Sequence, residues 1–149
     1  MIAVVQRVSS ASVDVVAEDV QSAIGQGLLV LVSIEPRDAE GDVTWMANKL
    51  ANLRIFPDEQ GLMNESVADV GGCVLLISQF TLSGNCTKGH RPSFISAAPP
   101  EQAEPMYESL ATAIRGHGLP VKTGVFGAAM KIQSTNEGPV TLIIHTPKR

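Results

Sequence analysis

The sequence predicts an α+β fold, in which an antiparallel-rich, β-barrel-like sheet carries two main helices. Short alternating or apolar runs, rich in β-branched residues, predict seven or eight strands along the 149 residues. Only two segments place apolar residues at helical spacing, and they do not alternate with strands as βαβ units would. We expect one domain, residues 1–149, because this length suits a single core and no linker or repeat interrupts it.

The first part of the chain supplies four of these strands, at residues 2–8, 12–15, 20–24 and 28–34. The fourth is a continuous apolar run, "LLVLVSI", which indicates burial on both faces of the sheet. A helix is expected over residues 42–53, with Asp42 as its N-cap. Its apolar stripe comprises Val43, Met46, Ala47, Leu50 and Leu53.

The second part continues with a short strand at residues 54–56 and a buried strand at 73–77, which leads into the polar stretch "SQFTL". A second helix is expected to begin near Glu104, with Pro105 at its first position, and to end before Gly116. Strands at residues 119–123, 129–135 and 140–145 complete the chain. A Gly-Pro pair precedes the last one, and proline is confined to the edges, first positions and bulges of strands.

Composition excludes several classes of protein. A net charge of −4 argues against a general nucleic-acid coat protein. The stretch "TKGHRPSF", with Lys88, His90 and Arg91, is either a local basic patch or a solvated loop. No apolar run reaches the length of a membrane span. Two cysteines, Cys73 and Cys86, indicate neither a disulfide framework nor a zinc site, so we expect a cytoplasmic protein.

Candidate chemistry is concentrated after the buried strand at residues 73–77. Ser78, Gln79, Phe80 and Thr81 follow it directly, and polar groups at the end of a rigid strand make a good site. The alternative is a strand that becomes polar as it surfaces. The three histidines lack metal-ligand spacing, and no known nucleophile, zinc or phosphate-loop motif is present, so no metal or cofactor is expected.

Two signatures, "SQFTL" and "NEGPVT", carry a family resemblance, together with "AVVQRVSSASV", "GLLVLVSI", "RIFPDEQGLMN", "KGHRPSF" and "GVFGAAM". In this order and spacing they resemble the D-aminoacyl-tRNA deacylases over nearly the whole chain. The resemblance implies a compact barrel-like homodimer that cleaves the ester between a D-amino acid, or glycine, and the terminal adenosine of a tRNA. Two positions depart from the pattern: Glu137 replaces a commoner Asp, and Val125 replaces a basic residue, which weakens any phosphate contact there.

The resemblance also implies roles for individual residues. The Gly138–Pro139 peptide bond is expected to be cis and to reach into the pocket of the partner subunit as the chirality filter. Arg7 would help to hold this loop. The remaining roles fall to Ser78, Gln79, Phe80 and Thr81, as the wall beside the scissile ester, and to Phe126 and Met130, near the terminal adenine.

An aminoacyl ester is already activated, so we expect the vicinal 2′-OH of the tRNA to assist the attack by water. Backbone N–H groups around Phe80 and Thr81 would stabilise the oxyanion. A covalent nucleophile, Thr81 or Ser78, is disfavoured because no base is adjacent. Three alternatives remain. They are a non-catalytic tRNA- or nucleic-acid-binding module, a related editing enzyme with a trans Gly-Pro bond that acts on small L-residues, and a structural oligomer that leaves the polar stretch unexplained.

Overall fold

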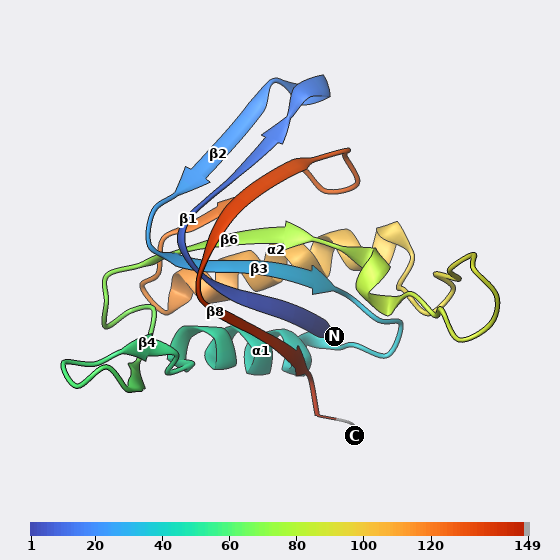
Figure 1. Ribbon diagram of the computed structural model, residues 1–149. Helices are drawn as coiled ribbons and strands as arrows, with labels where there is room; N and C mark the ends of the chain where they lie inside the picture. Colours follow the sequence, from blue (N-terminus) through green and yellow to red (C-terminus); the bar gives the residue numbers. More distant parts are fainter. Residues whose placement is uncertain (148–149) are drawn as a thin grey trace.

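A computed structural model describes residues 1–147 and confirms the α+β architecture (Figure 1). A strongly curved, barrel-like sheet of six strands packs against two helices. The sheet strands are β1 (Ile2–Val15), β2 (Val20–Ile24), β3 (Gly27–Ser33), β6 (Cys73–Ser78), β7 (Val121–Thr123) and β8 (Lys131–His145). The other elements are α1 (Glu40–Asn52), α2 (Pro100–Gly116), a small ribbon of β4 (Phe56–Pro57) and β5 (Met63–Glu65), and the 3₁₀ turns η1 (Val16–Glu18) and η2 (Phe80–Ser83).

The sheet is mixed, so the expectation of an antiparallel-rich sheet without βαβ units was wrong. β1 pairs antiparallel with β2, β3 and β8, whereas β3, β6 and β7 run parallel to one another. Parallel neighbours need a long crossover, and α1 and α2 provide the two crossovers. The βαβ units were not evident from the sequence, because a long segment without regular α-helix or sheet strands separates each helix from one of the strands that it connects.

β1 is one long strand and not the two strands that the sequence predicted. Its ladder with β8 shifts register around Val8, and the buried face changes there. Ala3 and Val5 lie in the core beneath the helices, whereas Val13 and Val15 lie in a second core on the other face of the sheet. A bulge therefore lets a single strand contribute to both cores.

The central strands β3 and β6 are buried on both faces, as their apolar runs predicted. Leu28 and Leu76 belong to the core that α1 and α2 cover. Leu29 and Leu75 belong to the second core. The C-terminal ends of these two parallel strands are consequently held rigidly from both sides, and this is where the candidate site lies.

The helix boundaries required two corrections. Asp42 is not the N-cap of α1, because the helix begins at Glu40; its carboxylate instead accepts a hydrogen bond from the Ala39 N–H at 2.9 Å. α2 begins at Pro100 and not near Glu104, so Pro105 lies inside it. Pro105 is exposed, and the carbonyl that loses its intrahelical partner can therefore bind water.

β8 is also continuous, although two strands were expected, and it lies at the edge of the sheet. Asn136 pairs opposite Val8 and Thr141 opposite Gln6, so residues 137–140 stand against Arg7 alone. The Gly138–Pro139 peptide bond is cis, as the resemblance implied, and not trans as one alternative required.

Candidate functional site

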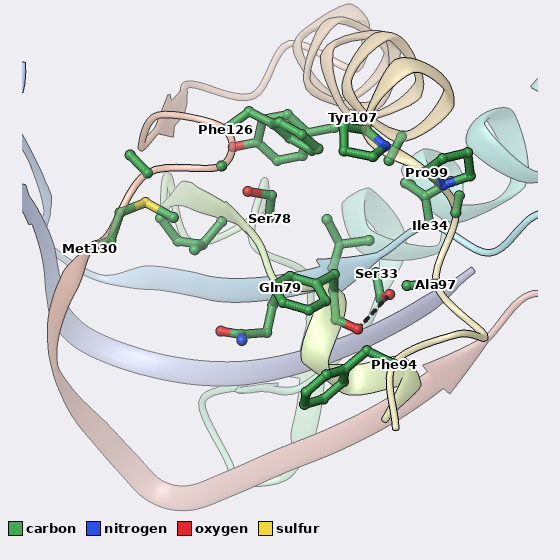
Figure 2. Close-up of a pocket in the computed structure, with 18 of the residues that line it drawn as sticks. Ser33, Ile34, Ser78, Gln79, Phe94, Ala97, Pro99, Tyr107, Phe126 and Met130 are labelled. Carbon is green, nitrogen blue, oxygen red and sulfur yellow. Dashed lines mark hydrogen bonds between the residues drawn. The ribbon is translucent and has the colours of Figure 1, made fainter. Parts of the chain in front are cut away.

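A cavity of about 580 Å³ lies at the C-terminal ends of β3 and β6 (Figure 2). The chain segment before α2, the start of α2 and the loop before β8 form its other walls. Ends of parallel strands commonly form ligand sites. The lining residues are Val32, Ser33, Ile34, Ile77, Ser78, Gln79, Phe80, Phe94, Ala97, Ala98, Pro99, Pro100, Ala103, Tyr107, Phe126, Gly127, Ala128, Met130 and Ile132.

The cavity brings together several of the candidate residues, namely Ser78, Gln79, Phe80, Phe126 and Met130. They come from β6, from the turn that follows it and from the loop before β8, some 50 residues later. Figure 2 shows Ser78 and Gln79 along one wall, with Phe126 and Met130 across from them.

The other candidates lie elsewhere. Thr81, Arg7, Gly138 and Pro139 are not among the described residues that line this cavity in a single chain. Thr81 is nevertheless tied to the cavity wall, because its Oγ1 accepts a hydrogen bond from Nε2 of Gln79.

The turn after β6 is fixed by backbone and hydroxyl contacts. The Gln79 N–H donates to the Val32 carbonyl at 2.7 Å, which extends the ladder between β3 and β6 by one bond. Ser33 and Ser83 share a buried hydrogen bond of 2.7 Å between their hydroxyl oxygens. Phe80 opens η2, and an N–H at the start of a helix has no acceptor within that helix.

The cavity is neutral along its described walls, since it contains no Asp, Glu, His, Lys or Arg. Tyr107 is its one titratable residue in the described chain, and burial raises the pKa of the Tyr107 phenol well above its ordinary value of 10. The phenol donates to the Leu76 carbonyl at 2.7 Å, and the ring packs on Phe126 with centroids 5.9 Å apart. Tyr107 is therefore a protonated wall residue and not a general base.

Residues 1–147 hold no cluster of three or more His, Cys, Asp or Glu side chains that could bind a metal ion. The same residues include no helix long and apolar enough to cross a membrane.

Arg7 holds residues 137–140 of β8, the segment without ladder partners in β1, in place. Its Nε donates to the Glu137 carbonyl at 2.9 Å, and its Nη1 donates to the Ile55 carbonyl at 2.6 Å. The Asn136 side chain closes the segment from inside, because its Oδ1 accepts from the Val140 N–H at 2.8 Å. The Glu137 contact ties this segment to Arg7 of β1, the Ile55 contact anchors the guanidinium, and the Asn136 contact closes the segment on itself.

Gly138 is required where it stands. Its φ of +136° is a conformation that L-residues rarely adopt. A Cβ would lie 2.8 Å from the Val140 side chain and 3.0 Å from the Arg7 guanidinium. Gly138 and Pro139 are exposed, so this segment presents bare backbone to its surroundings at the edge of the sheet.

The sequence did not identify Phe94 and Tyr107 as site residues. Phe94 contacts Phe80 edge to face, with centroids 5.3 Å apart and planes at 75°. It lies in the block "KGHRPSF", so its place in that motif was an available signal. Tyr107 belongs to the buried face of α2, and nothing in its spacing along the sequence distinguishes a cavity wall from a core.

Comparisons with known proteins agree on one family. The model of the family described as D-Tyr-tRNA(Tyr) deacylase matches residues 4–145. The D-aminoacyl-tRNA deacylase of Geobacter sulfurreducens is 51% identical over 149 residues, covering 100% of this chain and 97% of that protein. The D-aminoacyl-tRNA deacylase of Desulfitobacterium hafniense is 53% identical over 148 residues, covering 99% of each.

A solved structure described as c-Myc DNA Unwinding Element Binding Protein is also similar. It superimposes with a TM-score of 0.90 at 42% identity, covering 99% of this chain and 100% of that one. The barrel-like arrangement of the sheet and the two helices is therefore shared along the whole length.

Proposed function

We propose that this chain, which belongs to the D-Tyr-tRNA(Tyr) deacylase family, hydrolyses the ester bond of D-aminoacyl-tRNAs in the cytoplasm. The observation that carries the proposal is the uncharged cavity in which a polar strand end faces an aromatic and thioether wall. The relatives that match nearly the whole chain are hydrolases of this kind by name.

The cavity suits the end of an aminoacyl-tRNA. Its volume of about 580 Å³ lies within the range of small-molecule sites, roughly 300–1,000 Å³. Phe126 and Met130 offer a ring and a polarisable sulfur to the terminal adenine. Ser78 and Gln79 place a hydroxyl and an amide where the ester would lie, which orients the bond without adding charge.

Catalysis is assigned to positioning and to the substrate itself. The described walls contain no acid or base, and the phenol of Tyr107 is already committed to a carbonyl. We assign assistance of the attacking water to the vicinal 2′-OH of the tRNA. The N–H groups of Phe80 and Thr81 would stabilise the oxyanion, by about 3 kcal/mol for each well-placed donor.

Thr81 would then position Gln79 and would not attack the ester itself. Its hydroxyl accepts from the Gln79 amide and does not line the cavity. A covalent mechanism requires a base beside the nucleophile, so Thr81→Ala is expected to slow hydrolysis without abolishing it. Complete loss of turnover with retained tRNA binding would favour the nucleophile model.

Chirality would be selected by Gly138 and Pro139 of a second copy. Because these residues do not line the cavity of their own chain, the role needs a homodimer in which the segment enters the partner's cavity. β8 supports this arrangement, since it lies at the sheet edge and exposes 37% of Leu142 and 67% of Ile143.

A fixed backbone wall discriminates by steric exclusion. An L-residue would direct its side chain against the wall, whereas a D-residue would direct it away. Glycine has no side chain to exclude, so glycyl-tRNA, including glycine mischarged on tRNA-Ala, is expected to be hydrolysed. Complete resistance of the glycyl ester would contradict this account.

The deciding experiment compares hydrolysis of D-Tyr-tRNA with that of L-Tyr-tRNA by the purified protein. We expect turnover of the D-ester alone. A D-Tyr-tRNA that ends in 2′-deoxyadenosine should bind but react far more slowly, and normal cleavage of it would refute the 2′-OH mechanism.

A second candidate function is a non-catalytic nucleic-acid-binding module. It is favoured by the 42% identical structure whose description names a DNA-unwinding-element-binding protein. The same assay separates the two functions, because such a module would bind tRNA and leave both esters intact.

A further inference from the structure

A basic loop beside the cavity has no role in the function proposed above. The loop spans residues 85–93 and is termed the basic loop here; it carries Lys88, His90 and Arg91, all exposed. Between Asp69 and Glu101 the sequence contains no carboxylate at all. A chain with a net charge of −4 thus keeps one region free of negative charge.

Hydrogen bonds fix the base of the loop, where Asn85 Oδ1 also accepts from the N–H and the hydroxyl of Thr87. Asn85 and Ser93 exchange two backbone hydrogen bonds, of 2.8 and 3.0 Å. The loop projects from the end of the sheet at which β6 leads into η2 (Figure 1, yellow). Each limb has about four residues, which at about 3.4 Å per residue could span at most about 14 Å.

Aromatic rings connect the basic loop to the cavity. Phe94 follows the loop directly, lines the cavity and is 37% exposed; its neighbour Phe80 is 58% exposed. A Cβ at Gly84 would lie 2.8 Å from the Phe94 ring, so the chain entering the loop packs closely against that ring. Cationic side chains beside exposed rings are the combination that binds single-stranded nucleic acid.

We propose that the basic loop binds the phosphates of the unpaired nucleotides that precede the terminal adenosine of the tRNA. This inference rests on the proposed function, since it places the adenosine in the cavity. Lys88 and Arg91 each neutralise one phosphate, and the ring of Phe94 lies between them and the reacting ester. The overall negative charge would repel RNA, so attraction has to come from a local cationic site such as this one.

Equilibrium binding tests the inference without any need for hydrolysis. The probes are a short single-stranded RNA with a 3′ CCA end and a blunt RNA duplex. Both are titrated against the wild type, a Lys88→Ala/Arg91→Ala variant and the control Lys49→Ala, which removes an exposed lysine of α1. Each lost phosphate contact lowers the salt slope for single strands by about 0.7, so the double variant should lose about 1.4.

That slope has a direct consequence for affinity. The advantage of the wild type over the double variant should shrink about sevenfold between about 50 and 200 mM salt, whereas Lys49→Ala should match the wild type. An unchanged slope in the double variant, or an equal loss of affinity for the blunt duplex, would overturn the proposal.

Hydrolysis provides the second readout. For the double variant, kcat/KM should fall about tenfold more on D-Tyr-tRNA than on D-tyrosyl-adenosine, which carries no phosphate. Equal losses on both substrates would show that the loop only supports the fold, and would refute the phosphate role. If the wild type hydrolyses neither substrate while the slopes still differ, the proposed function fails and the RNA contact stands.

Discussion

Replacing Tyr107 by phenylalanine tests whether the cavity contains any catalytic side chain. The substitution removes a hydroxyl that donates to the Leu76 carbonyl at 2.7 Å from a residue only 5% exposed. A buried hydrogen bond contributes about 1 kcal/mol, and a carbonyl left unpaired raises the loss towards about 2 kcal/mol. For a domain of this size, each 1 kcal/mol lowers Tm by about 2–4 °C. We therefore expect Tm to fall by about 2–8 °C.

The assay pairs thermal unfolding with hydrolysis of D-Tyr-tRNA at a temperature well below Tm. We expect kcat to change by less than about threefold, because the hydroxyl faces backbone and remains protonated. Tyr107→Leu is the companion variant, since it also removes the ring that packs on Phe126 and should raise KM. A loss in kcat of more than about 30-fold in Tyr107→Phe, with Tm unchanged, would refute the reasoning and make the phenol catalytic.

Three further predictions concern the fold and its pH dependence. Gly27→Ala should lower the free energy of unfolding by more than about 3 kcal/mol in denaturant titrations, because its Cβ would lie 1.8 Å from the Cys73 carbonyl oxygen. Gly25→Ala is the matched control, because a Cβ at that position would have no atom within 4 Å. The pH profile of kcat should not be bell-shaped, since no cavity side chain in the described chain titrates near neutrality, and a bell-shaped profile would contradict the assignment. Hydrogen bonds from Ser66 lower the pKa of Asp69 below its ordinary value of 3.8. The ionised Asp69 carboxylate therefore stabilises the folded state above pH 3.8, and this stabilisation is lost as the pH falls through the lowered pKa. The difference in Tm between the wild type and Asp69→Asn should disappear over that pH range.

Burial on two faces was the feature of this fold easiest to predict from sequence. The continuous apolar runs at residues 28–34 and 73–77 predicted strands buried on both faces, and both are central strands of the sheet. Their parallel pairing was not predictable in the same way, because strand direction depends on crossovers that local patterns do not record. Pro105 misled the prediction of α2, since apolar contacts of Ala103 and Tyr107 outweigh the lost hydrogen bond of an exposed turn.

The residues of the candidate site were likewise predictable from sequence only where a local pattern marked them. Ser78, Gln79 and Phe80 stood out because polar residues follow a buried strand abruptly, and they do line the cavity. Phe94 and Tyr107 could not be found from periodicity, since their partners lie far away along the chain. The roles proposed for Gly138 and Pro139 rest on the resemblance to a family, because neither residue lines the cavity of its own chain.

The segment of β8 opposite Arg7 has a consequence for how two copies would associate. Residues 137–140 are joined at both ends to ladder pairs with β1, and Arg7 and Asn136 fix the backbone between them. Ordering a free residue costs about 1–2 kcal/mol of backbone entropy. For four residues that loss, about 4–8 kcal/mol, is incurred when the chain folds. If this segment docked into a second copy, association would not incur that entropy loss again. A modest contact area would then suffice to hold the segment in the partner.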